Sequence, residues 1–155
     1  MKDILLILFI AIPSGIFAQP LDMENDSVVK VGQFVALYEV YFEFNNPLLV
    51  DSNQVELDMI VNFLLKHKNI NIEIGVHTDF RGSDNYNLNM SKKRATSLKK
   101  YIVNKGVEEN RVVAIGFGEA KPVIEYEDWK NFYDTHVCGY YLRSNRRVTV
   151  VITKI

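Results

Sequence analysis

The sequence predicts an α+β domain, a two-layer sandwich in which a mixed β-sheet has its helices on one face. Segments with strand periodicity alternate with segments of helical periodicity, which is typical of strand–helix–strand units with right-handed crossovers. The segment Ile70–His77 alternates apolar and polar residues, which indicates one dry and one wet sheet face. The last predicted strand follows a long loop, so it is free to run antiparallel to the others.

The N-terminal end has the layout of a secretory signal peptide over residues 1–18. Lys2 precedes an apolar run from Ile4 to Ile12, and Ala18 ends a suitable cleavage site. The apolar run is too short for a membrane span, which needs about 20 apolar residues. We therefore expect no transmembrane span. No cysteine lies near the cleavage site, so we also expect no lipid anchor there.

The remaining chain is predicted to be a flexible segment over residues 19–27 and one folded domain over residues 28–155. The 155-residue sequence is 48% hydrophobic and 24% charged, which is ordinary for a globular protein. Its formal net charge of -1 gives no general attraction to nucleic acid. Cys138 is the single cysteine, so the hydrophobic core must stabilise the domain without an internal disulfide.

The first predicted element is a short N-terminal β-hairpin. Its arms are Val28–Val31 and Phe34–Leu37, on either side of the turn residue Gly32. The second arm is expected to continue through Val40–Phe44, where apolar and polar residues alternate, and to end at Asn45.

Two amphipathic helices are predicted. The first begins after Asp51, a helix N-cap residue that Gln54 follows three positions later. Its apolar face repeats at helical spacing through Val55, Met59, Ile60, Phe63 and Leu64. The second helix is expected from about Asn85 to Lys105, and Gly106 is its expected stop.

Two further strands are predicted to complete the sheet. They are Val112–Phe117, which is rich in apolar residues, and Arg147–Thr153, in which apolar residues alternate with others. The long segment between them, residues 118–145, has three aromatic residues at helical spacing and is expected to form a short helix: Trp129, Phe132 and Tyr133.

The candidate site lies in the stretch HTDFRGSDNYNLNMSKKRA, residues 77–95. Asp79 follows a predicted strand, and Gly82 lets the chain turn into a helix. Asn87 and Arg94 are seven residues apart, which is about two helical turns and places them on one face. A carboxylate beside a guanidinium can hold a zwitterion, since one binds an ammonium and the other a carboxylate. The residues alone leave open the alternative of a turn aspartate and a solvated helix arginine.

Catalytic and metal sites are not predicted. No serine, cysteine or histidine spacing supplies a nucleophile with its base. His67, His77 and His136 lack the ligand spacing of a zinc site. The segment Gly116-Phe117-Gly118 is too short for a dinucleotide-binding loop and does not open a convincing helix. We therefore expect no enzyme, no metal and no cofactor.

A series of short motifs runs along the chain in a fixed order. They are Thr78-Asp79, Gly82, Tyr86-Asn87, Ser91, Arg94-Ala95, Gly106, Gly116-Phe117-Gly118-Glu119, Pro122 and Asn145-Arg146-Arg147-Val148. Over about residues 37–155 the sequence resembles the OmpA-like peptidoglycan-binding domain family. That resemblance implies the family's βαβαββ order of elements, here after the N-terminal hairpin.

The resemblance also implies a function and a set of ligand-binding residues. The family binds peptidoglycan non-covalently, and its Thr-Asp and Arg-Ala motifs hold the diaminopimelate of the stem peptide, which implies this role for Asp79 and Arg94. By motif position, supporting contacts come from Thr78, Asn87, Asn45 and Arg146. The resemblance implies a free-standing module in the periplasm or cell envelope of a Gram-negative bacterium, exported by its signal peptide.

A second function stays open, in which the same fold serves as a periplasmic adaptor. The segment 124–144 is longer than in the shortest family members and contains Trp129 and Cys138. An envelope protein is the expected partner of that segment.

Overall fold

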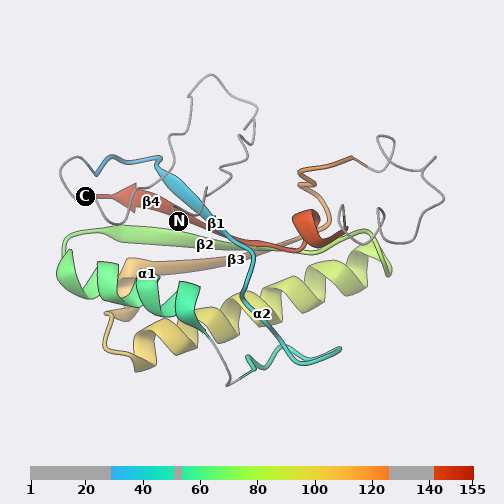
Figure 1. Cartoon of the computed structure of the whole chain (residues 1–155), viewed down its shortest axis with the longest axis horizontal. Helices are drawn as coiled ribbons and strands as arrows, with labels where there is room; N and C mark the ends of the chain where they lie inside the picture. The colour runs from blue at the N-terminus through green and yellow to red at the C-terminus, as the bar shows by residue number, and fades with distance from the viewer. Residues whose placement is uncertain (1–28, 51–53, 126–141) are drawn as a thin grey trace, which may run out of the picture.

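The computed structural model describes residues 29–50, 54–125 and 142–155. Its elements, in chain order, are β1 (Phe34–Leu37), α1 (Val55–Lys66), β2 (Asn71–His77), α2 (Asp84–Asn104), the 3-10 turn η2 (Glu109–Arg111), β3 (Val112–Gly118) and β4 (Val148–Lys154). Both labelled α-helices lie on one side of the sheet (Figure 1). The predicted two-layer α+β sandwich with βαβαββ order is therefore confirmed.

The four strands form one mixed sheet in the order β1-β4-β2-β3. β2 and β3 pair in parallel across the crossover helix α2, with Ile74 opposite Ala114. β4 lies between β1 and β2 and runs antiparallel to both. The long segment before β4 thus returns the chain to the middle of the sheet.

The dry face of β2 forms the centre of the hydrophobic core. Its apolar residues and the residue before the strand are almost fully buried: Ile70, Ile72, Ile74 and Val76. They share one core cluster with Leu57, Ile60 and Leu64 of α1 and with Leu98 and Ile102 of α2. The alternation in the sequence predicted this face correctly, because each second side chain of a strand points the same way.

The expected wet face of β2 is only partly wet. Asn71 and Glu73 are half-exposed as predicted, but Gly75 and His77 are buried. The His77 ring stacks on the Phe117 ring with centroids 5.0 Å apart, and its Nε2 lies 3.2 Å from Thr149 Oγ1. Side chains from the strands on either side of β2 therefore cover the end of this face.

The predicted N-terminal hairpin is not found among the described residues. Residues 29–33 form a turn and not a strand, and β1 pairs with β4 instead. Gly32, with a φ of 88°, donates its N–H to Ile152 O at 2.8 Å. β4 is a seven-residue strand and offers β1 a longer partner than the four residues that precede Gly32.

The strand expected over Val40–Phe44 is reduced to a single bridge between Phe42 and Leu49. Asn45 has a φ of 54°, which folds residues 43–48 into a turn at this point. A short, turned segment therefore replaces the continuous strand.

The helices begin and end close to their predicted bounds. α1 begins at Val55, and Gln54 occupies its N-cap position without a capping side-chain bond. The cap predicted at Asp51 lies outside the described residues, as do the aromatic residues of the 126–141 segment and Cys138. Ser83 caps α2 by accepting a hydrogen bond from the Tyr86 N–H.

The packing of α2 on β3 is unusually close at Gly116. A Cβ at this position would lie 2.2 Å from the backbone nitrogen of Lys92, so a side chain there would displace the helix. The glycine thus sets how closely α2 approaches the sheet, and the same contact fixes the first half of α2 beside the end of β2.

Buried Arg111 joins the end of α1 to the start of β2. Its guanidinium donates to the backbone oxygens of Leu64, His67 and Ile70 at 2.6 to 3.0 Å. The Leu64 oxygen belongs to the last turn of α1, where carbonyl groups lack intrahelical partners, and the Ile70 oxygen lies just before β2.

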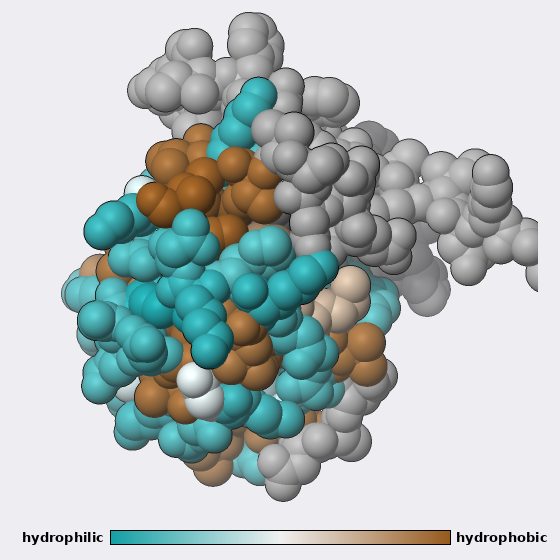
Figure 2. Space-filling view, turned by 90° about the vertical axis from the view of Figure 1, so that its left-hand side faces the viewer, coloured by the Kyte–Doolittle hydropathy of each residue, from teal (hydrophilic) through white to brown (hydrophobic). Residues whose placement is uncertain are grey.

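Figure 2 looks onto the end of the molecule at which α1 ends and the C-terminus lies. Its surface is mostly hydrophilic, and hydrophobic residues show through in small groups, as is normal for a globular surface. Within the described ranges, neither helix combines the length and the apolar character needed to cross a membrane.

Candidate functional site

A cavity of about 690 Å³ lies at the end of the sheet where β2 ends and α2 begins. Its walls come from the segment after β1, the loop after β2, the first half of α2 and residues 143–148. All six residues predicted for the site line this cavity: Asn45, Thr78, Asp79, Asn87, Arg94 and Arg146. Segments far apart in the sequence thus meet around one hollow.

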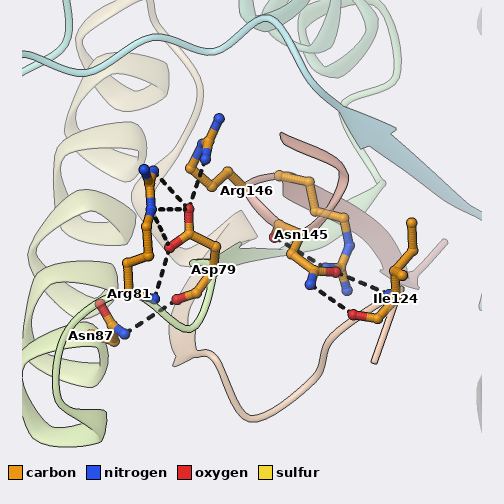
Figure 3. Close-up of polar contacts among 7 residues, drawn as sticks. Asp79, Arg81, Asn87, Ile124, Asn145 and Arg146 are labelled. Carbon is orange, nitrogen blue, oxygen red and sulfur yellow. Dashed lines mark hydrogen bonds and ion pairs between the residues drawn. The ribbon is translucent and has the colours of Figure 1, made fainter. Parts of the chain in front are cut away.

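Asp79 is the buried anionic group of the cavity, with 5% of the residue exposed. Its Oδ1 accepts a hydrogen bond from the Arg81 backbone N–H at 3.0 Å. Its Oδ2 lies 3.0 Å from Arg81 Nη2 and 2.7 Å from Arg146 Nη1. Figure 3 shows the two guanidinium groups converging on this carboxylate from different segments.

The two arginines keep Asp79 ionised. Burial alone acts to raise the pKa of this carboxyl group. Hydrogen bonds from Arg81 and Arg146 outweigh the effect of burial, so the pKa of Asp79 lies below its ordinary value. The cavity therefore holds a fixed negative charge at neutral pH.

Arg94 is the second predicted residue, and it makes no direct bond to Asp79 in the described structure. Its guanidinium lies over the Phe42 ring, 4.8 Å from the centroid, and its Nε is buried without a hydrogen-bond partner. Burial lowers the pKa of Arg94, although Tyr86 and Asp79 act in the opposite direction. The alternative of a solvated helix charge is therefore wrong for Arg94, whereas Asp79 does make the turn hydrogen bond.

Asn87 and Thr78 hold the loop that presents Asp79. Asn87 Nδ2 donates to Asp79 O at 3.2 Å, and it also donates to the Glu119 carboxylate. The Thr78 N–H donates to Gly118 O at 2.9 Å, which continues the pairing of β2 with β3 by one step. Thr78 Oγ1 is buried without a partner in the described structure and borders the cavity.

Asn45 closes the cavity from the segment after β1. Its Oδ1 accepts a hydrogen bond from the Tyr86 hydroxyl group of α2. The turn that removed the predicted strand thus positions a polar side chain against the first turn of α2. Because residue 45 has a positive φ, asparagine suits this position better than most residues.

In the Asn145-Arg146-Arg147 motif, one residue belongs to the site and two stabilise the fold. Arg146 binds Asp79, whereas buried Arg147 donates to the Lys121 carbonyl oxygen at 3.1 Å. Asn145 binds the chain after β3, since its Oδ1 accepts from Ile124 N at 3.1 Å and its Nδ2 donates to Ile124 O at 2.9 Å (Figure 3).

Besides Arg147, which the sequence gave only as part of a motif, two arginines of the cavity were missed in the sequence. Arg81 lies two residues after Asp79, so the chance of an ion pair across the turn was visible in the sequence. Arg143 lines the cavity from the segment before β4, and no local pattern pointed to it. In the described ranges, no group of three or more histidine, cysteine, aspartate or glutamate residues could hold a metal ion.

The chain is similar to proteins of one known family. The model of the OmpA family matches residues 41–134. The peptidoglycan-associated lipoprotein of Buchnera aphidicola subsp. Baizongia pistaciae is 38% identical over 84 residues, which are 54% of this chain and 49% of that protein. The chain therefore spans about half the length of this relative.

A second relative and a solved structure agree with this match. The peptidoglycan-associated lipoprotein of Rhizobium meliloti is 32% identical over 105 residues, covering 68% of this chain and 57% of that protein. The crystal structure of the peptidoglycan-associated lipoprotein from Burkholderia pseudomallei matches with a TM-score of 0.60 and 27% identity, covering 85% of this chain and 100% of that chain. With the family model matching well over half of its length, this chain belongs to the OmpA family.

Proposed function

We propose that this chain binds peptidoglycan non-covalently in the cell envelope of a Gram-negative bacterium, through the diaminopimelate residue of the stem peptide. One observation supports this most directly: buried Asp79 and half-buried Arg94 line the same cavity. Arg94 has no ion-pair partner in the described ranges. The names of its relatives agree, since two are peptidoglycan-associated lipoproteins.

The side chain of diaminopimelate ends in an ammonium and a carboxylate on one carbon. In our proposal, the ammonium of the ligand binds the Asp79 carboxylate. The guanidinium of Arg94 binds the carboxylate of the ligand through two parallel N–H donors. The low pKa of Asp79 keeps it charged for this role. The Phe42 ring holds the Arg94 guanidinium in place before the ligand arrives.

The ligand must share Asp79 with the arginines that already bind it. The Arg81 side chain is 62% exposed, so it can move into solvent at little cost when an ammonium takes its place. Arg146 binds the same carboxylate oxygen at 2.7 Å and remains beside the ligand. Thr78 Oγ1 and Asn45 supply further polar groups on the walls.

Binding without bond cleavage is the activity that we propose. Export by residues 1–18 would bring the domain to the periplasm, where peptidoglycan lies. The alternative function, an adaptor that binds an envelope protein through residues 124–144, depends mainly on residues outside the described ranges.

Co-sedimentation with purified peptidoglycan sacculi tests the proposal. Wild type is expected in the pellet, whereas Asp79→Asn and Arg94→Lys are expected mostly in the supernatant while remaining folded. Asp79→Asn removes the negative charge that binds the ammonium, and Arg94→Lys removes the two-donor fork that binds the carboxylate, so we expect at least about tenfold weaker binding for each. Lys100→Gln, which alters an exposed cation of α2 outside the cavity, is the matched control and should sediment like wild type.

Three results would contradict the proposal. Binding of sacculi by both site variants at the wild-type level would remove Asp79 and Arg94 from the ligand site. Release of soluble fragments from the sacculi during incubation would indicate an enzyme. Failure of wild type to sediment would favour the adaptor function.

A further inference from the structure

The cavity has more positive charge than a zwitterionic group requires. Five arginines line it, together with only two carboxylates. These residues are Arg81, Arg94, Arg143, Arg146 and Arg147, with Asp79 and Glu43. His77 also lines the cavity but is neutral. Its burial is the main cause that lowers its pKa to about 3, and the positive charges of Arg147 and Lys121 add to this effect. The lining therefore has three positive charges in excess.

Most of these charged groups already have partners. Arg81 and Arg146 bind Asp79, and Arg147 is buried on backbone carbonyl groups. Glu43 accepts a hydrogen bond from Asn46 Nδ2 at 2.7 Å.

Two arginines are left over from this pairing. In the described part of the chain, neither Arg94 nor Arg143 forms an ion pair. These two residues come from different segments, Arg94 from α2 and Arg143 from the chain before β4. They can therefore contact different parts of one ligand.

We propose that Arg143 forms a second anion site, which binds a carboxylate of the stem peptide other than the one at the end of the diaminopimelate side chain. This inference rests on the proposed function. A stem peptide offers such groups, because its D-glutamate is linked through the side chain and keeps a free α-carboxylate. Its last residue has a free carboxylate as well. Asp79 and Arg94 together satisfy the zwitterion, so Arg143 makes the cavity selective for ligands with an additional negative charge.

The consequence is discrimination between free and amidated stem peptides. An amide has nearly the shape of a carboxylate but no charge, so it loses the charge-assisted bond to a guanidinium. A guanidinium donates two parallel hydrogen bonds to the two oxygens of a carboxylate. An amide has only one oxygen to accept such a bond. Amidation of the carboxylate that Arg143 binds should weaken binding, although the diaminopimelate side chain is unchanged.

Calorimetric titration of three synthetic tripeptides tests this inference. The first is L-alanyl-γ-D-glutamyl-meso-diaminopimelate with all carboxylates free. The others have either the D-glutamate α-carboxylate or the backbone carboxylate of diaminopimelate converted to an amide. We expect at least one amide to bind wild type about tenfold more weakly than the free peptide.

Arg143→Gln should remove this tenfold difference, because the group that distinguishes carboxylate from amide is gone. Lys100→Gln removes the same charge from an exposed position outside the cavity and should keep the difference. Arg143 is itself exposed, so the variant should fold, and its thermal melt checks this.

The outcomes separate this inference from the proposed function. If wild type binds all three peptides equally, Arg143 reads no carboxylate and only the inference fails. The same holds if Arg143→Gln weakens all three peptides by one common factor. If wild type binds none of them, the proposed function fails and the inference fails with it.

Discussion

Acid should destabilise this domain through His77, the residue two positions before Asp79. His77 is 5% exposed and stays neutral, because burial mainly, and also Arg147 and Lys121, lower its pKa to about 3. In the unfolded chain its pKa returns to about 6.5. Between these values the unfolded chain binds a proton that the folded chain does not. Stability is therefore complete above about pH 6.5 and decreases as the pH falls toward 3.

The size of the effect follows from this difference in pKa. Each pH unit below 6.5 costs about 1.4 kcal/mol, so about pH 5 should cost about 2 kcal/mol. Asp79 has a lowered pKa and thus contributes stability that is lost only below the ordinary range of a carboxyl group. Its contribution therefore does not change between about pH 7 and about pH 5.

Urea denaturation at about pH 7 and about pH 5 measures the effect. Wild type should lose about 2 kcal/mol more unfolding free energy than His77→Gln, which has no proton to gain at this position. All other titrating groups are common to both chains and cancel in the comparison. Thr149→Val removes the hydrogen-bond partner of His77 but keeps it buried, so it should retain the wild-type loss. Equal losses in wild type and His77→Gln would refute the reasoning.

Two further predictions concern the packing that positions the site. Arg111→Met removes the guanidinium that donates to three main-chain carbonyl groups and should lower the unfolding free energy by about 1–3 kcal/mol in a urea melt. A change below about 0.5 kcal/mol would show that water replaces the guanidinium. Gly116→Ala places a Cβ against the backbone of α2 and should cost at least about 1–3 kcal/mol in the same assay. A wild-type melt for Gly116→Ala would contradict the close packing of α2 on β3.

The regular elements could be predicted from the sequence because their signals are local. The alternation over Ile70–Val76 and the helical spacing before and after it are properties of single segments, and the structure has a strand and two helices there. The predicted apolar face of α1 is only partly correct, because Val55 and Met59 are exposed. The second face of β2 could not be predicted in this way. His77 is buried by Phe117 and Thr149, which come from the two neighbouring strands.

The prediction of an N-terminal hairpin was wrong for the same reason, because the partner strand is distant in the sequence. Gly32 gave a local turn signal, but the partner that β1 takes is β4, more than 100 residues later in the chain. Local turn chemistry cannot exclude a longer partner strand from elsewhere in the fold.

The candidate site was predicted in its composition and missed in its internal contacts. The motifs and the resemblance gave Asp79, Arg94 and Arg146, and these residues line one cavity. The sequence did not indicate that Asp79 binds Arg81 and Arg146, or that Arg94 lies over Phe42. These contacts depend on how the turn before α1 and the chain before β4 fold over the end of β2.

The central claim is that Asp79 and Arg94 together hold the zwitterionic end of diaminopimelate. The most direct measurement compares two tripeptides that differ only in the third residue, meso-diaminopimelate or L-lysine. Both offer an ammonium to Asp79, but only diaminopimelate offers a carboxylate to Arg94. Wild type should bind the diaminopimelate peptide at least about tenfold more tightly, and Arg94→Lys should lose most of this preference. Equal affinity of wild type for the two peptides would contradict the claim.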